Sequence, residues 1–157
     1  HIVGHAGCGK TTLIVDLVKA LIKNNLSVGT MKHSAHVHEL DKPGKDSFRH
    51  RTAGAAPVAM VTEQMSAVYL PRDPSTTPEK LLETYYSGVD IVLIEGWISG
   101  PFQKIEVWRK SMDLSPLFPS IKVVKAIVTD DLLSQTKIPI FPRSTIDPLV
   151  NFILTLA

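Results

Sequence analysis

The sequence predicts an α/β fold in three layers, with helices packed on a mostly parallel β-sheet. Short apolar runs typical of buried strands alternate along the chain with longer segments whose apolar residues repeat at helical spacing. A length of 157 residues, with 44% hydrophobic and 20% charged residues, suits a single domain, residues 1–157, with a substantial core. The sequence contains no internal repeat and no low-complexity tract.

The first strand leads directly into the strongest motif of the chain. After an apolar strand end, residues 1–3, the sequence continues as GHAGCGKTT and matches G-x-x-x-x-G-K-[ST] through Gly4, Gly9, Lys10 and Thr11. Glycines let successive backbone N–H groups turn towards phosphate oxygens, and the N-terminus of the following helix adds a positive end. A strand, a glycine-rich loop and a helix in this order predict the phosphate-binding loop, or P-loop, of a P-loop NTPase.

The residues of this glycine-rich loop have individual expected roles. Lys10 is expected to reach the β- and γ-phosphates of a nucleotide, and the Thr11 hydroxyl to ligate Mg²⁺. His5 and Cys8 are expected to shape the loop or face the nucleotide. Cys8 is not expected to be a nucleophile, because the sequence indicates no base beside it that would activate the thiol. The nucleotide-binding residues predicted in this loop are Gly4, His5, Ala6, Gly7, Cys8, Gly9, Lys10, Thr11 and Thr12.

A helix and a second strand follow the loop. The helix, over residues 10–24, places its apolar side chains at the i, i+3 and i+4 spacing of a face packed on a sheet. Residues 26–31 predict a short buried strand. Residues 32–45 then form a polar, histidine-rich loop, in which the segment Asp41-Lys42-Pro43-Gly44 has turn chemistry.

Two shorter helices are expected in the middle of the chain. Asp46 is in place to cap a helix that Gly54 and Pro57 close. After a proline-rich linker, residues 78–86 predict another helix, with proline in its first turn and Thr77 as its cap.

The remaining strands fall into two groups. Residues 90–95 (DIVLIE), 123–128 and 138–141 predict strands of the parallel sheet, because an apolar run buried on both faces is typical of such strands. A C-terminal helix is expected over residues 145–156.

The other group is expected to form a small antiparallel β extension on one edge of the sheet. Residues 58–61 and 67–70 predict two short strands. Residues 104–108 (KIEVW) alternate between polar and apolar side chains, as in an edge or half-exposed strand.

The second half of a nucleotide site requires an acid near Mg²⁺ and a group that recognises the base. Glu95 ends an apolar strand, where it is expected to meet the metal through water, and the Gly96 N–H is expected to approach the γ-phosphate. Asp130 follows the strand VVKAIV and is the nearest equivalent of the GTPase aspartate that accepts hydrogen bonds from guanine, although Asn-Lys-x-Asp is absent. Arg143 and Ser144 are candidates to line the base pocket.

The histidine-rich loop and its surroundings, residues 32–47, are a candidate switch. Asp41, Lys45, Asp46 and Ser47 are the side chains there that could contact phosphate, position water or bind the metal through water. A zinc site is disfavoured, because no cysteine or acid completes a recognisable spacing with the loop histidines. Arginine fingers are sought on the following segment, at residues 49 and 51.

Composition sets the remaining bounds. A net charge of +2 does not argue for nucleic acid, and a single cysteine excludes an internal disulfide and fits a reducing compartment. No apolar run approaches a membrane span and no signal peptide is visible, so the cytoplasm is the default location and no membrane partner is expected. Because only three residues precede Gly4 and the first is not Met, we expect the natural chain to begin upstream.

Four stretches in this order resemble one family, the P-loop GTP-binding proteins called molybdopterin-guanine dinucleotide biosynthesis protein B (MobB). They are GHAGCGKTT, MKHSAHVHELDKPGKDSFRHRTAGA, VLIEGW and AIVTDD, and together they span most of the chain. The second is the most specific, since it joins a lysine–histidine pair at a strand end to DKPGKDS and R-x-A-G-A.

This resemblance implies a function and assigns site residues. It implies binding of GTP and Mg²⁺ with weak GTPase activity, a homodimer joined with help from the extra β-structure, and association with the guanylyltransferase that links GMP to molybdopterin. Lys10, Asp46 and Glu95 are the implied catalytic residues, and Thr11, Asp46 and Glu95 the implied metal-site residues. Asp130 is the implied guanine contact. Binding of molybdopterin itself is left open.

Other functions remain as alternatives. A small-molecule kinase using ATP would usually carry an arginine-rich lid, whereas Arg72, Arg109 and Arg143 are scattered in the sequence. A nickel-type metallochaperone GTPase would use the histidine-rich loop, but a Cys-Pro-Cys-like motif is absent. A binding module without turnover is barely distinguishable from a slow GTPase.

Overall fold

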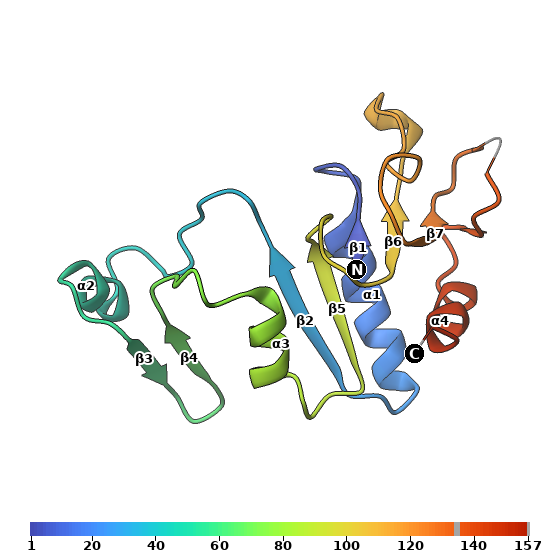
Figure 1. Cartoon of the computed structure of the whole chain (residues 1–157). Helices are drawn as coiled ribbons and strands as arrows, with labels where there is room; N and C mark the ends of the chain where they lie inside the picture. The colour runs from blue at the N-terminus through green and yellow to red at the C-terminus, as the bar shows by residue number, and fades with distance from the viewer. Residues whose placement is uncertain (134–135, 157) are drawn as a thin grey trace. The chain divides into compact units, whose positions relative to one another are not determined.

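The computed structural model describes residues 1–133 and 136–156 (Figure 1). The chain forms two compact units, His1–Ser34 with Thr84–Ala157, and Ala35–Glu83. We call them the larger and the smaller unit, and each is described by itself.

A six-stranded sheet forms the centre of the larger unit. Its order is β2-β5-β1-β6-β7-β8, and every neighbouring pair of strands is parallel. The strands are β1 (Ile2–Val3), β2 (Val28–His33), β5 (Ile91–Gly96), β6 (Lys104–Val107), β7 (Val124–Val128) and β8 (Ile140–Phe141). The predicted α/β class with a mostly parallel sheet is confirmed.

Two helices pack together with this sheet. The first, α1 (Lys10–Lys23), contacts β1, β2 and β5, and also α4 (Asp147–Leu154) (Figure 1). The apolar positions that predicted α1 are its buried positions, since Leu13, Leu17 and Leu21 are fully buried. The core between the sheet and these helices therefore holds the start of α1 in a fixed position after β1.

The strand β6 differs from its prediction. Its alternating sequence predicts an edge or half-exposed strand. In the structure, β6 lies inside the parallel sheet between β1 and β7, and all four of its residues are buried. The Lys104 ammonium donates to the carbonyls of Gly100 and Phe102 (2.6 and 3.1 Å). The Glu106 carboxylate accepts from the backbone N–H groups of residues 117 and 118 (2.6 and 2.8 Å). Because backbone groups partner both polar side chains, the strand can be buried on both faces.

The smaller unit contains the antiparallel extension. Strands β3 (Val58–Val61) and β4 (Ser66–Tyr69) pair with Val58 opposite Tyr69, and α2 (Asp46–Thr52) packs against β3. The predicted small antiparallel sheet is confirmed for these two strands and does not include residues 104–108.

The helix caps agree with prediction in one case and differ in the other. Thr77 accepts the backbone N–H of Lys80 through its side chain (3.3 Å), so it caps α3 (Pro78–Tyr85) as predicted. Asp46 was expected to cap α2, but the cap position belongs to Lys45 and Asp46 is the first helical residue. An acid in the first turn still stabilises a helix through the helix dipole.

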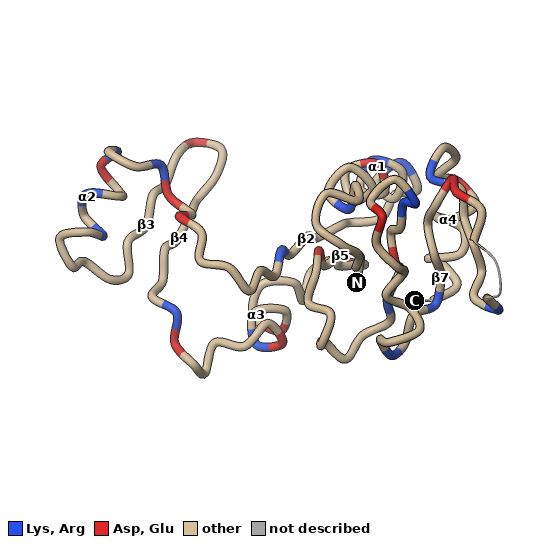
Figure 2. Tube along the Cα trace, turned by 90° about the horizontal axis from the view of Figure 1, so that it is seen from above, with Lys and Arg blue, Asp and Glu red and all other residues tan. Residues whose placement is uncertain are grey.

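Lys and Arg residues are mixed with Asp and Glu along the chain, in keeping with its net charge of +2 (Figure 2). None of the helices in the described ranges has the length and apolar character needed to cross a bilayer.

Candidate functional site

The carboxyl ends of the parallel strands bring the predicted site residues of the larger unit to one edge of the sheet. The glycine-rich loop follows β1, Glu95 and Gly96 end β5, and Asp130 follows β7. The chain leaves β1 towards β2 on one side, while β6, β7 and β8 lie on the other. Ligands of open α/β sheets bind at such a switch point, outside the carboxyl ends of the strands.

The glycine-rich loop is tightly packed where it leaves β1. Gly4 has a φ of +141°, and a side-chain carbon there would lie 2.3 Å from the carbonyl oxygen of Val107. Only glycine fits that position, because the backbone conformation and the neighbouring strand both exclude a larger residue. Cys8 is a buried free thiol in the same loop.

Lys10 is folded over the loop. Its ammonium donates to the carbonyls of Gly4 and His5 (3.0 and 2.7 Å). These carbonyl oxygens thus accept the hydrogen bonds that the ammonium would give to phosphate oxygens of a bound nucleotide. Burial raises the pKa of the neighbouring Cys8 thiol, while the charge of Lys10 opposes that rise. Cys8 is therefore a neutral thiol at neutral pH, which suits a residue that shapes the loop.

Thr11 and Glu95 meet across the site. The Thr11 hydroxyl donates to Oε2 of Glu95 (2.9 Å), although the two residues are 84 positions apart. Hydroxyl and carboxylate oxygens are the protein ligands that Mg²⁺ prefers, so this pair fits a magnesium site. Lys32, at the end of β2, forms an ion pair with Oε1 of Glu95 (3.2 Å). Sequence reasoning gave Lys32 no role, and the only signal was its place beside His33 at a strand end.

Gly96 connects β5 to a buried aromatic residue. With a φ of +83°, it lies so close to β2 that a side-chain carbon would come within 2.7 Å of the His33 carbonyl oxygen. The next residue, Trp97, has a φ of +55°, and its ring stacks on the His33 imidazole with centroids 5.8 Å apart. Trp97 was not predicted as a site residue. Its position depends on contacts between two strands that are distant in sequence.

A pocket of about 250 Å³ lies beyond the ends of β6 and β7. Its lining includes Trp108, Arg109, Thr129, Asp130, Asp131 and Arg143. Oδ1 of Asp130 accepts both the backbone N–H and the hydroxyl of Ser144 (3.0 Å each). These hydrogen bonds, the backbone one foremost, lower the pKa of Asp130, so its carboxyl is ionised at neutral pH.

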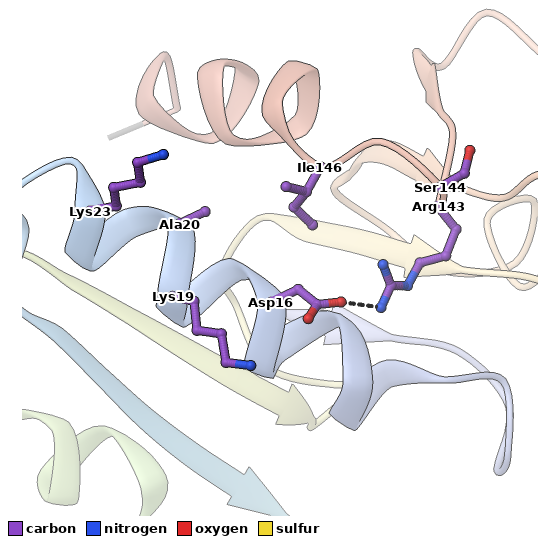
Figure 3. Close-up of a pocket in the computed structure, with 7 residues that line it drawn as sticks. All are labelled: Asp16, Lys19, Ala20, Lys23, Arg143, Ser144 and Ile146. Atoms are coloured by element: carbon purple, nitrogen blue, oxygen red, sulfur yellow. Dashed lines mark hydrogen bonds and ion pairs between the residues drawn. The ribbon is translucent and has the colours of Figure 1, made fainter.

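Arg143 links this pocket to α1. Its guanidinium forms an ion pair with Asp16, and both residues line a second cavity of about 360 Å³ together with Lys19, Lys23 and Ser144 (Figure 3). The pocket beyond the ends of β6 and β7 thus brings together Arg109, Asp130 and Arg143, which are far apart in the sequence.

The other predicted residues belong to the smaller unit. Asp46 is the first residue of α2. Because it lies in the smaller unit, its expected place beside the metal and the γ-phosphate stays a prediction. Asp41 is buried and accepts a hydrogen bond from the Ser47 hydroxyl (3.0 Å), which indicates a structural role for this pair. Arg51 pairs with Glu39. Within the described residues, no group of three or more His, Cys, Asp or Glu side chains is arranged to hold a metal ion.

Comparison with known proteins identifies relatives over nearly the whole chain. The model of the family described as MobB, molybdopterin guanine dinucleotide synthesis protein B, matches residues 1–130. The molybdopterin-guanine dinucleotide biosynthesis adapter protein of Haemophilus influenzae is 33% identical over 130 residues, which cover 82% of this chain and 72% of that protein. The adapter protein of the same name from Escherichia coli strain K12 is 28% identical, covering 95% and 87%.

A solved structure agrees with these matches. The crystal structure of Bacillus subtilis MobB superimposes with a TM-score of 0.76 at 27% identity, covering 99% of this chain and 94% of that one. The family model, the relatives and the solved structure thus agree with the resemblance that the sequence motifs carry. This chain belongs to the MobB family.

Proposed function

We propose that this protein binds GTP with Mg²⁺, hydrolyses it slowly, and acts as an adapter in molybdopterin guanine dinucleotide biosynthesis. The observation that supports nucleotide binding is the hydrogen bond between Thr11 and Glu95. It lies beside the glycine-rich loop, over whose backbone the Lys10 ammonium is folded. The adapter part is supported by the names of the relatives from Haemophilus influenzae and Escherichia coli.

The phosphates are bound by the loop and by Lys10. On binding, the ammonium exchanges the carbonyls of Gly4 and His5 for phosphate oxygens, while backbone N–H groups at the start of α1 complete the cradle. Thr11 and Glu95 would hold Mg²⁺, which would supply positive charge to offset that of the nucleotide phosphates. Catalysis then consists of positioning and electrostatics, with Lys10 and Glu95 as the contributing side chains of the larger unit.

Guanine is selected by Asp130. Its ionised carboxylate has one oxygen held by Ser144, and it faces the pocket between the ends of β6 and β7. Guanine presents N–H donors at N1 and N2, whereas adenine cannot offer this pair to a carboxylate. The geometry thus supports GTP over ATP, because an unpaired carboxylate beside adenine would cost binding energy.

The partner of the adapter is the guanylyltransferase that links GMP to molybdopterin, and the protein acts as a homodimer. Support for protein contacts comes from the smaller unit, where β3, β4 and the residues beside them expose Met60, Val61, Met65, Val68 and Leu70. The strand register puts Val61 and Val68 on the same face of this hairpin, and exposed apolar side chains that share a face favour an interaction surface.

Calorimetric titration of the full-length protein with GTP and with ATP, each with Mg²⁺, tests the nucleotide assignment. We expect clear preference for GTP and loss of binding in Lys10→Ala. Preference for ATP would move the assignment to a small-molecule kinase, and undiminished GTP binding by Lys10→Ala would remove the phosphate role of the loop.

A further inference from the structure

The segment that follows β6 folds over the glycine-rich loop. Three contacts define this arrangement. The His5 imidazole hydrogen-bonds to the Ser115 carbonyl (2.9 Å), a side-chain carbon on Gly7 would lie 3.4 Å from Cε of Met112, and Gly9 faces Arg109. The residues after β6 therefore form a wall of the candidate phosphate site, although they carry no part of the phosphate-binding motif.

Arg109 makes the closest approach in this wall. A side-chain carbon on Gly9 would come within 2.9 Å of Nη2 and 3.4 Å of Cζ of the guanidinium. Gly9 is the residue directly before α1, where backbone N–H groups point towards a bound phosphate. The guanidinium thus lies against the positive rim of the loop, where a cation is unfavourable unless an anion is also present.

Arg109 forms no ion pair within the part of the chain that the structure describes. The ion pairs found in residues 1–133 and 136–156 are Lys32–Glu95, Arg51–Glu39 and Arg143–Asp16. Asp131, in the same pocket, is used by the backbone N–H of Lys110 (2.8 Å). Arg109 is itself exposed, so a ligand can reach it.

We infer that Arg109 binds the α- and β-phosphates of the nucleotide; this inference rests on the proposed nucleotide-binding function. The assignment to these two phosphates follows from position. Arg109 lines the pocket that contains Asp130, at the base end of the site, whereas Glu95 and Thr11 mark the opposite end, with the metal and the γ-phosphate. The α- and β-phosphates lie between the two ends of any bound nucleotide.

The chemistry of arginine suits this role. A planar guanidinium donates two parallel hydrogen bonds to phosphate oxygens, which a lysine ammonium cannot reproduce. Sequence reasoning sought arginine fingers at Arg49 and Arg51. Those two residues belong to the smaller unit, and their role stays a prediction. In the larger unit, Arg109 lies against the loop and follows the same strand end that supplies the carbonyl beside Gly4.

The test compares Arg109→Ala, Arg109→Lys and the adjacent Lys110→Ala, which removes the same charge one position away. Each full-length variant is titrated calorimetrically with GTP and with GDP in the presence of Mg²⁺. We expect Arg109→Ala to weaken both nucleotides equally, on the order of tenfold to a hundredfold, with partial recovery in Arg109→Lys and little change in Lys110→Ala. Thermal unfolding without nucleotide should be the same for all four proteins.

The contradicting results are distinct. Unchanged GTP and GDP affinities in Arg109→Ala would overturn this inference and leave the proposed function standing. A loss confined to GTP would place Arg109 at the γ-phosphate and overturn the assignment to the α- and β-phosphates. Weaker binding with a lower unfolding temperature and no recovery in Arg109→Lys would assign Arg109 to loop structure. Failure of the unmodified protein to bind either nucleotide would overturn both proposals.

Discussion

Ser144 holds Asp130 with two donors, its backbone N–H and its hydroxyl, both on the same carboxylate oxygen. The side chain is thereby oriented before any ligand arrives, which reduces the entropy lost on binding. Asp130 and Ser144 are 14 positions apart, so the sequence around Asp130 predicted a guanine contact but did not show the residue that orients its carboxylate.

Asp130→Asn should weaken GTP binding by about tenfold to a hundredfold and leave ATP binding nearly unchanged, because the charged acceptor for guanine is lost. Asparagine can still accept the Ser144 hydrogen bonds, so the fold should be preserved. Calorimetric titration with both nucleotides measures the effect. Asp131→Asn is the matched control, and equal losses for GTP and ATP would exclude a guanine-specific role.

Glu106 gives a pH-dependent stability. Burial raises the pKa of this fully buried carboxyl above its ordinary 4.5, despite two backbone hydrogen bonds. The folded state therefore binds the proton more tightly than the unfolded state, and the stability it contributes below pH 4.5 is lost as the pH rises through the raised pKa.

Glu106→Gln removes this titration. We expect the free energy of unfolding of the unmodified protein, relative to Glu106→Gln, to fall as the pH rises from about 4.5 through the raised pKa. Urea unfolding at a series of pH values measures the difference. A relative stability that increases with pH over this range would show that the carboxylate, rather than the acid, is the favoured buried form.

At the scale of elements, local patterns predicted those parts whose partners are also local. The strand, the glycine-rich loop and α1 follow one another in the chain, and α1 begins at Lys10 and buries the predicted face. The same reasoning failed for β6. Lys104 and Glu106 look solvent-exposed by pattern, yet backbone groups outside the strand satisfy them. The carbonyls that accept from Lys104 are close in sequence, but a side-chain pattern does not show where they point, and the donors to Glu106 lie 11 and 12 positions away.

The end of β5 should tolerate no side chain at residue 96. Gly96→Ala places a carbon 2.7 Å from the His33 carbonyl oxygen and imposes a left-handed backbone on a non-glycine residue. We expect it to lower the free energy of unfolding by about 1–3 kcal/mol. Denaturant unfolding measures this, with Gly88→Ala, where the added carbon meets no atom within 4 Å, as control. Equal stability of the two variants would contradict the packing argument.

At the scale of the whole molecule, the site exists because parallel strands end at one edge. Lys32, Glu95, Arg109 and Asp130 come from four different strand ends, so their proximity follows from strand order rather than from spacing in the sequence. Sequence motifs identified Glu95 and Asp130 because strand-end acids have recognisable contexts. Neither Lys32, near the end of β2, nor Arg109, after β6, had a predicted role of its own, and only the assembled sheet brings them to the site.

The apolar hairpin of the smaller unit should govern self-association. Val61 and Met65 are 75% and 73% exposed at its turn, where Thr62 maintains the backbone hydrogen bonds. We expect the double variant Val61→Ser, Met65→Ser to weaken a dimer on the order of tenfold per side chain. Sedimentation velocity at several concentrations measures the shift. Ile22→Ser, also exposed but on α1, should leave the dimer intact, and an unchanged double variant would place the interface elsewhere.

The two tryptophans of the chain both border the candidate site, Trp97 after Gly96 and Trp108 before Arg109, and both are buried. Residues 35–83 contain none. Intrinsic tryptophan fluorescence is therefore an optical signal from the larger unit alone. It can follow ligand exchange at the strand ends without a label, but a fluorescence melting curve would not register separate unfolding of the smaller unit, which circular dichroism would detect.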